Sequence, residues 1–461
     1  MSDTPASSSR VDSYKIRTKI QPRRDKGLFT TLRNSSVIIL LSIFYLFPWL
    51  NWSGRQAVLW DLPNRKFYIF DLVIWPQDFF FLAALLIIAA LALFFFTTVA
   101  GRLWCGFACP QTVWARALLW IEEVVEGDRN KRLRLDKSPW NSAKITKKGL
   151  KFSLWAIFAI WTGFTFVGYF SAIRDLTPRF FSFELGSAEA FWIFFYAFMI
   201  WLLGAVMREQ VCIYMCPYAR FQSVMYDSDT LLIAYDNSRG EPRAKGKRTK
   251  STDKGDCVEC SVCVQVCPMG IDIRDGLQYQ CTGCALCIDA CNNIMDKVDT
   301  PRNLIRYTTE NRLSGKDTNI MRPRVYIYAI LIIGMLMAVA VGLVNRGSVA
   351  LDIIRDRNTL FRDSGDGNIE NLYRLRIINK DVRAHVFNIS IEGLDKAKLE
   401  MDTSIPPIPS GEIHDKIVRI KIDPSELNGT RSTKFGIRIT AEDDENASTV
   451  EETRYLGPVR F

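Results

Sequence analysis

The chain has 461 residues, of which 48% are hydrophobic and 23% charged, and it carries a formal net charge of +10 at pH 7. Such a mixture requires apolar and polar residues to be segregated in blocks, so we expect a membrane part joined to soluble parts. Lys and Arg concentrate beside the hydrophobic stretches, where they meet anionic lipid headgroups. The charge therefore predicts membrane lipid, and no nucleic acid, as a partner.

Cysteine and histidine usage limits the cofactors. All twelve cysteines fall between positions 105 and 291, and such clustering favours metal ligation over a disulfide scaffold. The only two histidines, His385 and His414, lie far along the chain, which excludes a histidine-ligated haem in the membrane segments. Neither histidine is assigned a role. No G-x-G-x-x-G motif or P-loop is present, so we expect a separate electron donor, which the sequence does not identify.

Five apolar runs are long enough, or nearly long enough, to span a membrane. They cover residues 36–52, 79–100, 152–172, 190–207 and 325–344. The first begins only near Ser36, behind a polar tail, so we expect it to remain as an anchor rather than to be cleaved as a signal peptide. These runs predict an α-helical transmembrane bundle of about five spans.

Basic residues flanking the runs predict their orientation, because Lys and Arg in short loops favour the cytoplasmic side. Those before the first run are Lys15, Arg17, Lys19, Arg23, Arg24, Lys26 and Arg33. Those between the second and third runs are Arg129, Lys131, Arg132, Arg134, Lys137, Lys144, Lys147, Lys148 and Lys151. The loops at 53–78 and 173–189 have few. We therefore expect the N-terminus and the cysteine-rich segment in the cytoplasm, and the C-terminus outside.

The same patterns divide the chain into segments. The expected order is a basic tail (1–35), a region with four transmembrane helices (36–235), a flexible basic linker (236–256), an α+β ferredoxin domain (257–300), a cytoplasmic connector (301–324), the fifth helix (325–345) and a terminal domain (346–461). The linker's basic residues are Arg239, Arg243, Lys245, Lys247, Arg248 and Lys250. In the terminal domain, short alternating runs between Pro, Gly, Asn and Asp breakers predict an all-β sandwich.

The cysteine-rich segment carries a doubled ferredoxin spacing. The first half has the C-x2-C-x2-C-x3-C-P spacing of bacterial ferredoxins, and the second repeats its cysteines. Three closely spaced cysteines grip one cubane, while the fourth reaches the neighbouring cluster. We therefore expect two 4Fe-4S clusters. The expected ligands are Cys257, Cys260, Cys263 and Cys291 for the first cluster, and Cys281, Cys284, Cys287 and Cys267 for the second.

Zinc is the alternative metal for such a segment. Structural zinc sites usually take two C-x2-C pairs separated by a longer spacer and need four ligands, which a doubled triple-cysteine pattern fits poorly. One departure from the ferredoxin pattern is Asn292, which stands where the second half would have a proline. It affects the local turn and leaves the four ligands of each cluster intact.

Two further cysteine pairs follow the second and fourth apolar runs. Each has the spacing C-x3-C-P, with Cys105 and Cys109 in the first pair and Cys212 and Cys216 in the second. Residues i and i+4 share a helix face with Cβ atoms about 6 Å apart, so each pair could present two sulfurs to one ion, and the proline loosens the helix just past them.

Three readings of these pairs stay open at this point. Cysteines are small apolar residues that let helices pack closely. Soft thiolates select Cu(I), and Met207, Met215 and Met225 lie near the second pair, so copper is a candidate substrate. A redox-active dithiol is the third option.

Together these motifs resemble the CcoG family, also called FixG or RdxA, accessory proteins for assembly of cbb-type cytochrome c oxidase. The resemblance spans nearly the full length and includes the two C-x3-C-P motifs, the stretch from Cys281 to Cys291, the fifth span and the outer β-domain. It implies a bacterial inner-membrane cupric reductase that supplies Cu(I) to the oxidase, with Cys105, Cys109, Cys212 and Cys216 as the candidate catalytic site. It also implies an immunoglobulin-like terminal domain in the periplasm that docks partners.

The implied partners are oxidase assembly factors or copper donors, besides the unidentified electron donor. The alternative function is a quinol-linked polyferredoxin electron carrier, because NapH-like and NosR-like proteins also combine membrane C-x3-C-P motifs with ferredoxin clusters. A third hypothesis is a scaffold whose outer domain docks on oxidase subunits and whose clusters are structural.

Overall fold

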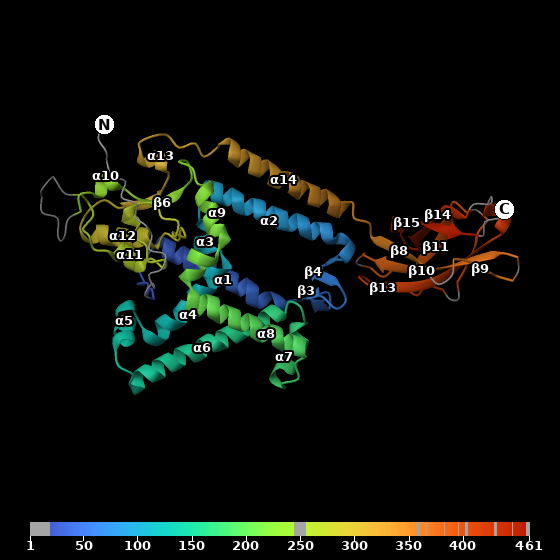
Figure 1. Cartoon of the computed structure of the whole chain (residues 1–461), viewed down its shortest axis with the longest axis horizontal. Coiled ribbons are helices and arrows are strands. Elements are labelled where there is room, and N and C mark those ends of the chain that lie inside the picture. The colour runs from blue at the N-terminus through green and yellow to red at the C-terminus, as the bar shows by residue number, and fades with distance from the viewer. Residues whose placement is uncertain are drawn as a thin grey trace. The chain divides into compact units, whose positions relative to one another are not determined.

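In the computed structural model the chain forms two compact units (Figure 1). Unit 1 contains the residues up to Arg65 and Phe80–Met335, and unit 2 contains Lys66–Phe79 and Leu336–Phe461. The structure describes residues 19–243 and 255–457, apart from positions 357–359, 366, 382, 395, 402–403, 428–430 and 445. Six of the basic residues used above lie outside the described residues, namely Lys15, Arg17, Lys245, Lys247, Arg248 and Lys250.

Five described helices are long and apolar enough to cross a membrane, which confirms the expected number of spans. They are α1 (Leu28–Leu46, extended by a 3-10 turn to Trp49), α2 (Phe79–Ala100), α6 (Ser142–Val167), α8 (Ser187–Ile200, continued by a π-helix over Trp201–Met207) and α14 (Pro323–Val344). The mean hydropathy of α2 reaches 3.0. Few of the apolar side chains of α2 and α14 are buried in the protein, as expected for surfaces that face lipid.

Two of these helices begin earlier than hydropathy predicted. Helix α1 starts at Leu28 because the carboxylate of Asp289 accepts hydrogen bonds from the backbone N–H groups of Phe29 (3.2 Å) and Thr30 (2.7 Å). Such capping of free N–H groups stabilises a helix start. Helix α6 starts at Ser142, where the side chain of Asn141 caps it, and ends at Val167. Its first turns therefore carry lysines that hydropathy excluded from the span.

Shorter elements connect the spans and form the cysteine-rich region. The helices are α3 (Leu103–Phe107), α4 (Pro110–Glu126), α5 (Arg129–Lys137), α7 (Ile173–Phe181), a π-helix (Val211–Met215), α9 (Pro217–Met225), α10 (Asn237–Gly240), α11 (Val262–Val266), α12 (Leu286–Lys297) and α13 (Glu310–Leu313). The strands are β1 (Asn51–Trp52), β2 (Arg55–Gln56), β3 (Val58–Asp61), β6 (Leu232–Tyr235) and β7 (Ile305–Thr308). Strands β6 and β7 pair antiparallel and bring the two ends of the cysteine-rich region together.

The described ends of the predicted linker are ordered, which differs from the flexible segment expected over 236–256. Residues 237–240 form α10, and Arg239 forms an ion pair with Asp256 at 2.6 Å. Asp236 forms an ion pair with Arg306 on β7 at 3.0 Å. The flanks therefore belong to the same folded body as the cysteines, because their charges find partners there.

A buried ionic cluster links α4 to four other parts of unit 1. The side chain of Glu122 is fully buried and pairs with Lys19 (2.8 Å), Lys151 (3.5 Å), Arg132 (4.0 Å) and Arg208. Burial favours the neutral carboxyl, but Arg208 and Lys19 outweigh it and lower the pKa of Glu122 to about 2. Glu122 is therefore charged, and its partners hold the N-terminal segment, α5, α6 and the end of the fourth span around α4.

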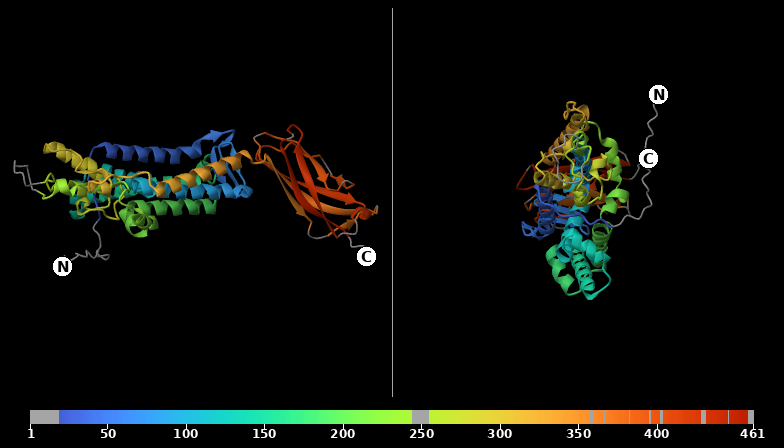
Figure 2. Two further views of the ribbon diagram at one scale, coloured as in Figure 1. Left: turned by 90° about the horizontal axis from the view of Figure 1, so that it is seen from above. Right: turned by 90° about the vertical axis from the view of Figure 1, so that its left-hand side faces the viewer.

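Unit 2 is an all-β sandwich, as expected, and Figure 2 shows its strands in two layers. Its strands are β8 (Val349–Arg355), β9 (Arg362–Asp363), β10 (Ile369–Asn379), β11 (Phe387–Glu392), β12 (Lys398–Glu400), β13 (Ile413–Ile422), β14 (Ser432–Ala441) and β15 (Ser448–Leu456). One sheet has the order β12-β13-β10-β8, with β9 beside β10, and the other has the order β11-β14-β15. Tyr373, Leu375 and Ile377 alternate along β10 and are fully buried between the sheets.

A hairpin from between the first two spans also belongs to unit 2, which the sequence did not predict. It consists of β4 (Lys66–Ile69) and β5 (Leu72–Ile74), and its Val73 and Trp75 pack against Ile378. Just before α2, Asp78 pairs with Arg346 at 2.6 Å and with Lys380 at 3.3 Å. These ion pairs hold the segment around Asp78 within unit 2.

His385 is buried in the sandwich between two carboxylates. Its Nδ1 lies 2.7 Å from Asp443 and its Nε2 lies 2.8 Å from Asp381. Burial disfavours the imidazolium, but hydrogen bonds to Asp443 and Asp381 outweigh it and raise the pKa of His385 above its usual value. Its two ring nitrogens are thus already engaged, which supports a structural role.

We predict that His385 makes unit 2 less stable at alkaline pH. A group whose pKa is raised by folding stabilises fully below its unfolded pKa, about 6.5 for His, and this contribution is lost as the pH rises through the folded value. The unfolding midpoint of the purified chain should therefore fall between pH about 6 and pH about 8. His385→Gln should flatten this slope, whereas Asp444→Asn, next to Asp443, should keep it. An unchanged slope in His385→Gln would refute the assignment.

Candidate iron-sulfur and thiol sites

Two cavities in unit 1 are lined by the eight cysteines of the ferredoxin spacing. The cysteines of the first cavity are Cys257, Cys260, Cys263 and Cys291. Those of the second are Cys267, Cys281, Cys284 and Cys287, with Cys263 at its edge. The structure therefore groups these residues in the two sets of four that the spacing predicts. The fourth cysteine of each half crosses to the other cavity.

The backbone repeats between the two halves as well. Ser261 and Ala285 stand two residues before Cys263 and Cys287, and both adopt the left-handed conformation, with φ of 54° and 59°. Residues other than glycine rarely adopt this conformation, and they keep it where the surroundings impose it, often at functional sites. Each turn directs the chain around its cavity before α11 or α12 begins.

The donor set fits iron-sulfur clusters better than zinc. Within the described ranges, no three His, Cys, Asp or Glu side chains lie close enough together to hold a single metal ion. A tetrahedral zinc site would require such a group, whereas a cubane spreads its four thiolate ligands over its corners. Apolar side chains enclose the cysteines, among them Ile233, Ile273 and Ile288. The two cavities could therefore each hold one 4Fe-4S cluster.

The two C-x3-C-P motifs have a different local structure from the one expected. Cys109 and Cys216 are extended residues that precede α4 and α9, with ψ of 129° and 109°. Pro110 and Pro217 take the first helical position, where proline is favoured because its missing N–H would have no partner. Each proline therefore starts a new helix rather than loosening an existing one, and the cysteines of a pair do not share one continuous helix face.

The four cysteines of these motifs, which we call the thiol quartet, nevertheless lie together. Burial, with smaller contributions from the neighbouring Cys109 and Cys216, raises the pKa of Cys105 to about 11. Burial, with smaller contributions from Cys109, Cys105 and Cys216, raises the pKa of Cys212 to about 12. Cys105 also lies 3.6 Å from the side-chain oxygen of Gln222 on α9. The thiols of Cys105 and Cys212 are thus mostly protonated at neutral pH, and a bound metal ion would displace their protons.

The quartet touches the second cavity through a glycine. Gly106 lies between the two cysteines of its motif, and a Cβ atom at this position would lie 2.9 Å from the Cα of Cys284 and from the carbonyl oxygen of Gly283. Only glycine allows this approach without a shift of the backbone. The loop that holds Cys105 and Cys109 therefore rests directly on a cysteine of the second cavity.

Two further contacts join the same regions. Arg102 donates a hydrogen bond to the carbonyl oxygen of Cys281 at 3.2 Å, and it also donates to the carbonyl oxygen of Ala219. Cys212 packs in one apolar cluster with Cys267 and Cys281 of the second cavity. Both halves of the quartet are thus adjacent to the second cavity, so an electron there has a short path to the quartet.

Comparisons with known proteins agree with these sites. Family models described as "4Fe-4S dicluster domain", "4Fe-4S binding domain" and "IG-like fold at C-terminal of FixG" match residues 207–310, 82–122 and 339–458. The chain is 37% identical to "Nitrogen fixation protein FixG" of Rhizobium meliloti over 431 residues, covering 84% of this chain and 82% of that protein. It is 41% identical to "Protein RdxA" of Cereibacter sphaeroides over 394 residues, covering 82% and 83%.

The chain belongs to the FixG/RdxA family. "Protein RdxB" of Cereibacter sphaeroides is 39% identical over 418 residues, covering 87% of this chain and 88% of that protein. The crystal structure of a FixG-related protein from Vibrio parahaemolyticus is 28% identical, covers 24% of this chain and 97% of that one, and has a TM-score of 0.22. This FixG/RdxA protein is an iron-sulfur electron-transfer protein of the membrane.

Sequence reasoning missed the residues that join the two sites of this FixG/RdxA protein. Gly106, Arg102 and Gln222 were not predicted to have a role, although Gly106 could have been noticed because it stands inside a C-x3-C-P motif. Of the methionines considered as copper ligands, Met215 is 54% exposed. The family match over residues 82–122 includes Cys105 and Cys109.

Proposed function

We propose that this FixG/RdxA protein reduces Cu(II) to Cu(I) at the thiol quartet for the assembly of cbb-type cytochrome c oxidase. The observation that carries the proposal is the backbone contact between Gly106 and Cys284, because it brings Cys105 and Cys109 next to the second cavity. Soft thiolates bind Cu(I) well, so the quartet suits the product of this reduction. If Cys105 and Cys212 keep their thiolate form only while copper is bound, they would also release the ion when they are protonated again.

The chain's own residues supply the surroundings for this electron transfer. The eight cysteines of the two cavities would hold two 4Fe-4S clusters, which supply one-electron carriers when bound. One electron converts one Cu(II) to one Cu(I), and an external one-electron reductant replaces it. No three described ligands form a single-ion site, so copper would be a transient substrate held by fewer side chains rather than a resident metal. Arg102 and Gly106 would keep the quartet against the second cavity.

We also propose an orientation for the chain in the bacterial inner membrane. The basic residues that flank the spans favour a cytoplasmic N-terminus and a cytoplasmic ferredoxin domain, with unit 2 in the periplasm. An all-β domain of the immunoglobulin type offers edges and loops for docking, so we assign unit 2 the binding of oxidase assembly factors or copper donors. Its partners there remain part of the proposal.

The test is anaerobic Cu(II) reduction by the purified chain in detergent, with chemically reduced clusters. The double substitution Cys105→Ser and Cys109→Ser should reduce the rate to that of buffer because it removes half of the quartet. Both cluster signals should remain in electron paramagnetic resonance spectra, since none of the eight cavity cysteines is changed. A rate equal to that of the unsubstituted chain would rule out the quartet as the copper site.

Two other outcomes would point to other functions. Rapid cluster reduction by added quinol, together with no Cu(II) reduction, would favour the quinol-linked electron carrier. If the variant with both substitutions contains less iron than the unsubstituted chain, an iron-sulfur cluster is bound at the quartet. The 4Fe-4S family match over residues 82–122 is compatible with this outcome. Ser142→Ala in α6, outside both motifs, is the matched control and should leave both readouts unchanged.

A further inference from the structure

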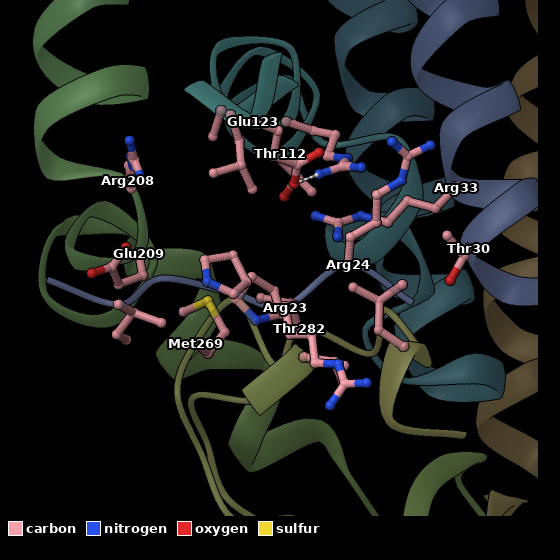
Figure 3. Close-up of a pocket in the computed structure, with 18 of the residues that line it drawn as sticks. Arg23, Arg24, Thr30, Arg33, Thr112, Glu123, Arg208, Glu209, Met269 and Thr282 are labelled. Carbon is pink, nitrogen blue, oxygen red and sulfur yellow. Dashed lines mark hydrogen bonds and ion pairs between the residues drawn. The ribbon is translucent and has the colours of Figure 1, made fainter. Parts of the chain in front are cut away.

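A basic pocket of unit 1 reaches Cys212 of the thiol quartet, but its arginines have no role in the proposed electron path. It has a free volume of about 90 Å³ and is formed by the N-terminal segment, α1, α4, the end of the fourth span and the ferredoxin region. In Figure 3 the side chains of Arg24, Arg33 and Glu123 lie at one end of this pocket, and Met269 lies at the other. Its volume corresponds to about three water molecules, which suits a tetrahedral anion.

Positive charge dominates the first end of the pocket. Arg33 and Arg116 are 7% and 8% exposed, and Arg24 lies beside them. Glu123 pairs with Arg116 at 2.9 Å. Burial lowers the pKa of Arg116, and the charges of Arg33 and Arg24 lower it further, which the charge of Glu123 opposes. The pocket as a whole is lined by five arginines and by three carboxylates, Asp25, Glu123 and Glu209, and this excess of positive charge is one that an anion would compensate.

Three polar atoms of the pocket are buried and have no hydrogen-bond partner among the described residues. They are Nε of Arg33, Oγ1 of Thr30 and Oε2 of Glu123. Leaving such groups unpaired costs about 1–3 kcal/mol each, so buried polar atoms usually face a ligand or a water molecule. The first two atoms donate hydrogen bonds, and the third, a carboxylate oxygen, accepts one. An anion that still carries a proton can satisfy all three, because it both accepts and donates hydrogen bonds, and the arginines favour its charge.

We propose that this pocket binds a phosphate group that retains a P–OH, held by Arg33, Arg116 and Thr30, with its hydroxyl donating to Glu123. The guanidinium groups form charge-assisted hydrogen bonds with phosphate oxygens. The proton requirement favours inorganic phosphate, which retains a P–OH at neutral pH, over sulfate, which has no proton there. Bound phosphate would join the N-terminal segment, α1, α4 and the ferredoxin region.

The test is calorimetric titration of the full chain in phosphatidylcholine nanodiscs, with inorganic phosphate or sulfate as the ligand. Phosphate should bind saturably and more tightly than sulfate. Arg33→Gln should weaken phosphate binding about tenfold or more, since it removes a charge-assisted hydrogen bond. Glu123→Gln should reduce the preference for phosphate over sulfate. Arg134→Gln, an exposed arginine on α5 outside the pocket, is the control and should bind as the unsubstituted chain does.

The remaining outcomes are also decisive. If phosphatidylglycerol in the nanodisc abolishes phosphate binding to the unsubstituted chain, a headgroup without a P–OH occupies the pocket and the proposal is overturned. Should Arg33→Gln fail to fold, Thr30→Val, which keeps the side-chain shape, must still weaken binding. No saturable phosphate binding in phosphatidylcholine would also overturn the proposal, as would equal binding by Arg33→Gln and the unsubstituted chain.

Discussion

Glu122→Gln should lower the free energy of unfolding by about 3–5 kcal/mol, the effect expected when one partner of a buried ion pair is removed. The reason is the position of Glu122, which is fully buried among Lys19, Lys151, Arg132 and Arg208. A neutral glutamine leaves these cations without their shared counterion. The change is measured from the midpoint of denaturant unfolding of the purified chain in detergent.

The control for this substitution is an exposed ion pair of the same unit. Asp296 pairs with Arg302 at 2.6 Å, and the two side chains are 42% and 65% exposed. Exposed pairs of this kind contribute little to stability because water screens both charges. Asp296→Asn should therefore leave the midpoint unchanged. If Glu122→Gln behaves like Asp296→Asn, the ionic cluster does not hold α4 in place.

Gly106→Val should slow Cu(II) reduction on the order of 10²-fold, the effect that a displacement of about 1 Å can have at a reacting site. A side chain at Gly106 meets the backbone of Gly283 and Cys284 at 2.9 Å, so the quartet and the second cavity must move apart. The substitution should have a smaller effect on the free energy of unfolding than on the rate of Cu(II) reduction, because the contact is local. The rate is measured anaerobically, and the cluster signals are recorded on the same samples.

Two further variants make this result interpretable. Gly149→Val in α6 is the matched control, because nothing lies within 4 Å of a Cβ atom at that position. Gly106→Ala introduces the same contact with a smaller side chain and should have a weaker effect in the same direction. If the second cluster is lost in Gly106→Val, the alanine variant carries the test. Unchanged reduction in a Gly106→Val protein with both cluster signals would show that electrons take another route.

The parts of the fold that the sequence predicted are those with a local signal. Five apolar runs predicted five membrane-length helices, because the hydrocarbon thickness sets the required length. Alternation along segments such as Tyr373 to Ile378 predicted the sandwich, because the two faces of each strand meet different surroundings. The doubled cysteine spacing likewise predicted which cysteines surround each of the two cavities. In each half, the short spacing confines the first three cysteines to one turn.

The parts that the sequence could not predict depend on contacts between distant segments. Asp289 fixes the start of α1, and Gly106 fixes the distance between the quartet and the second cavity. Both residues stand inside cysteine motifs, but nothing in these motifs indicates the distant segment that each residue contacts. The hairpin with Val73 and Trp75 joins the sandwich for the same reason, because its partner Ile378 lies some 300 residues further along the chain. The helical arrangement expected for the cysteine pairs was wrong, since each proline begins a helix instead of interrupting one.

The measurement that tests the central claim most directly is a single-turnover reaction between reduced clusters and Cu(II). The reduced chain and a variant with serine at Cys105, Cys109, Cys212 and Cys216 are each mixed anaerobically with Cu(II). Cluster reoxidation is followed by absorbance, and Cu(I) is followed with a chelator. We predict that the clusters of the unsubstituted chain reoxidise in step with Cu(I) formation, whereas those of the variant stay reduced. Equal reoxidation rates in the two proteins would contradict electron transfer through the thiol quartet.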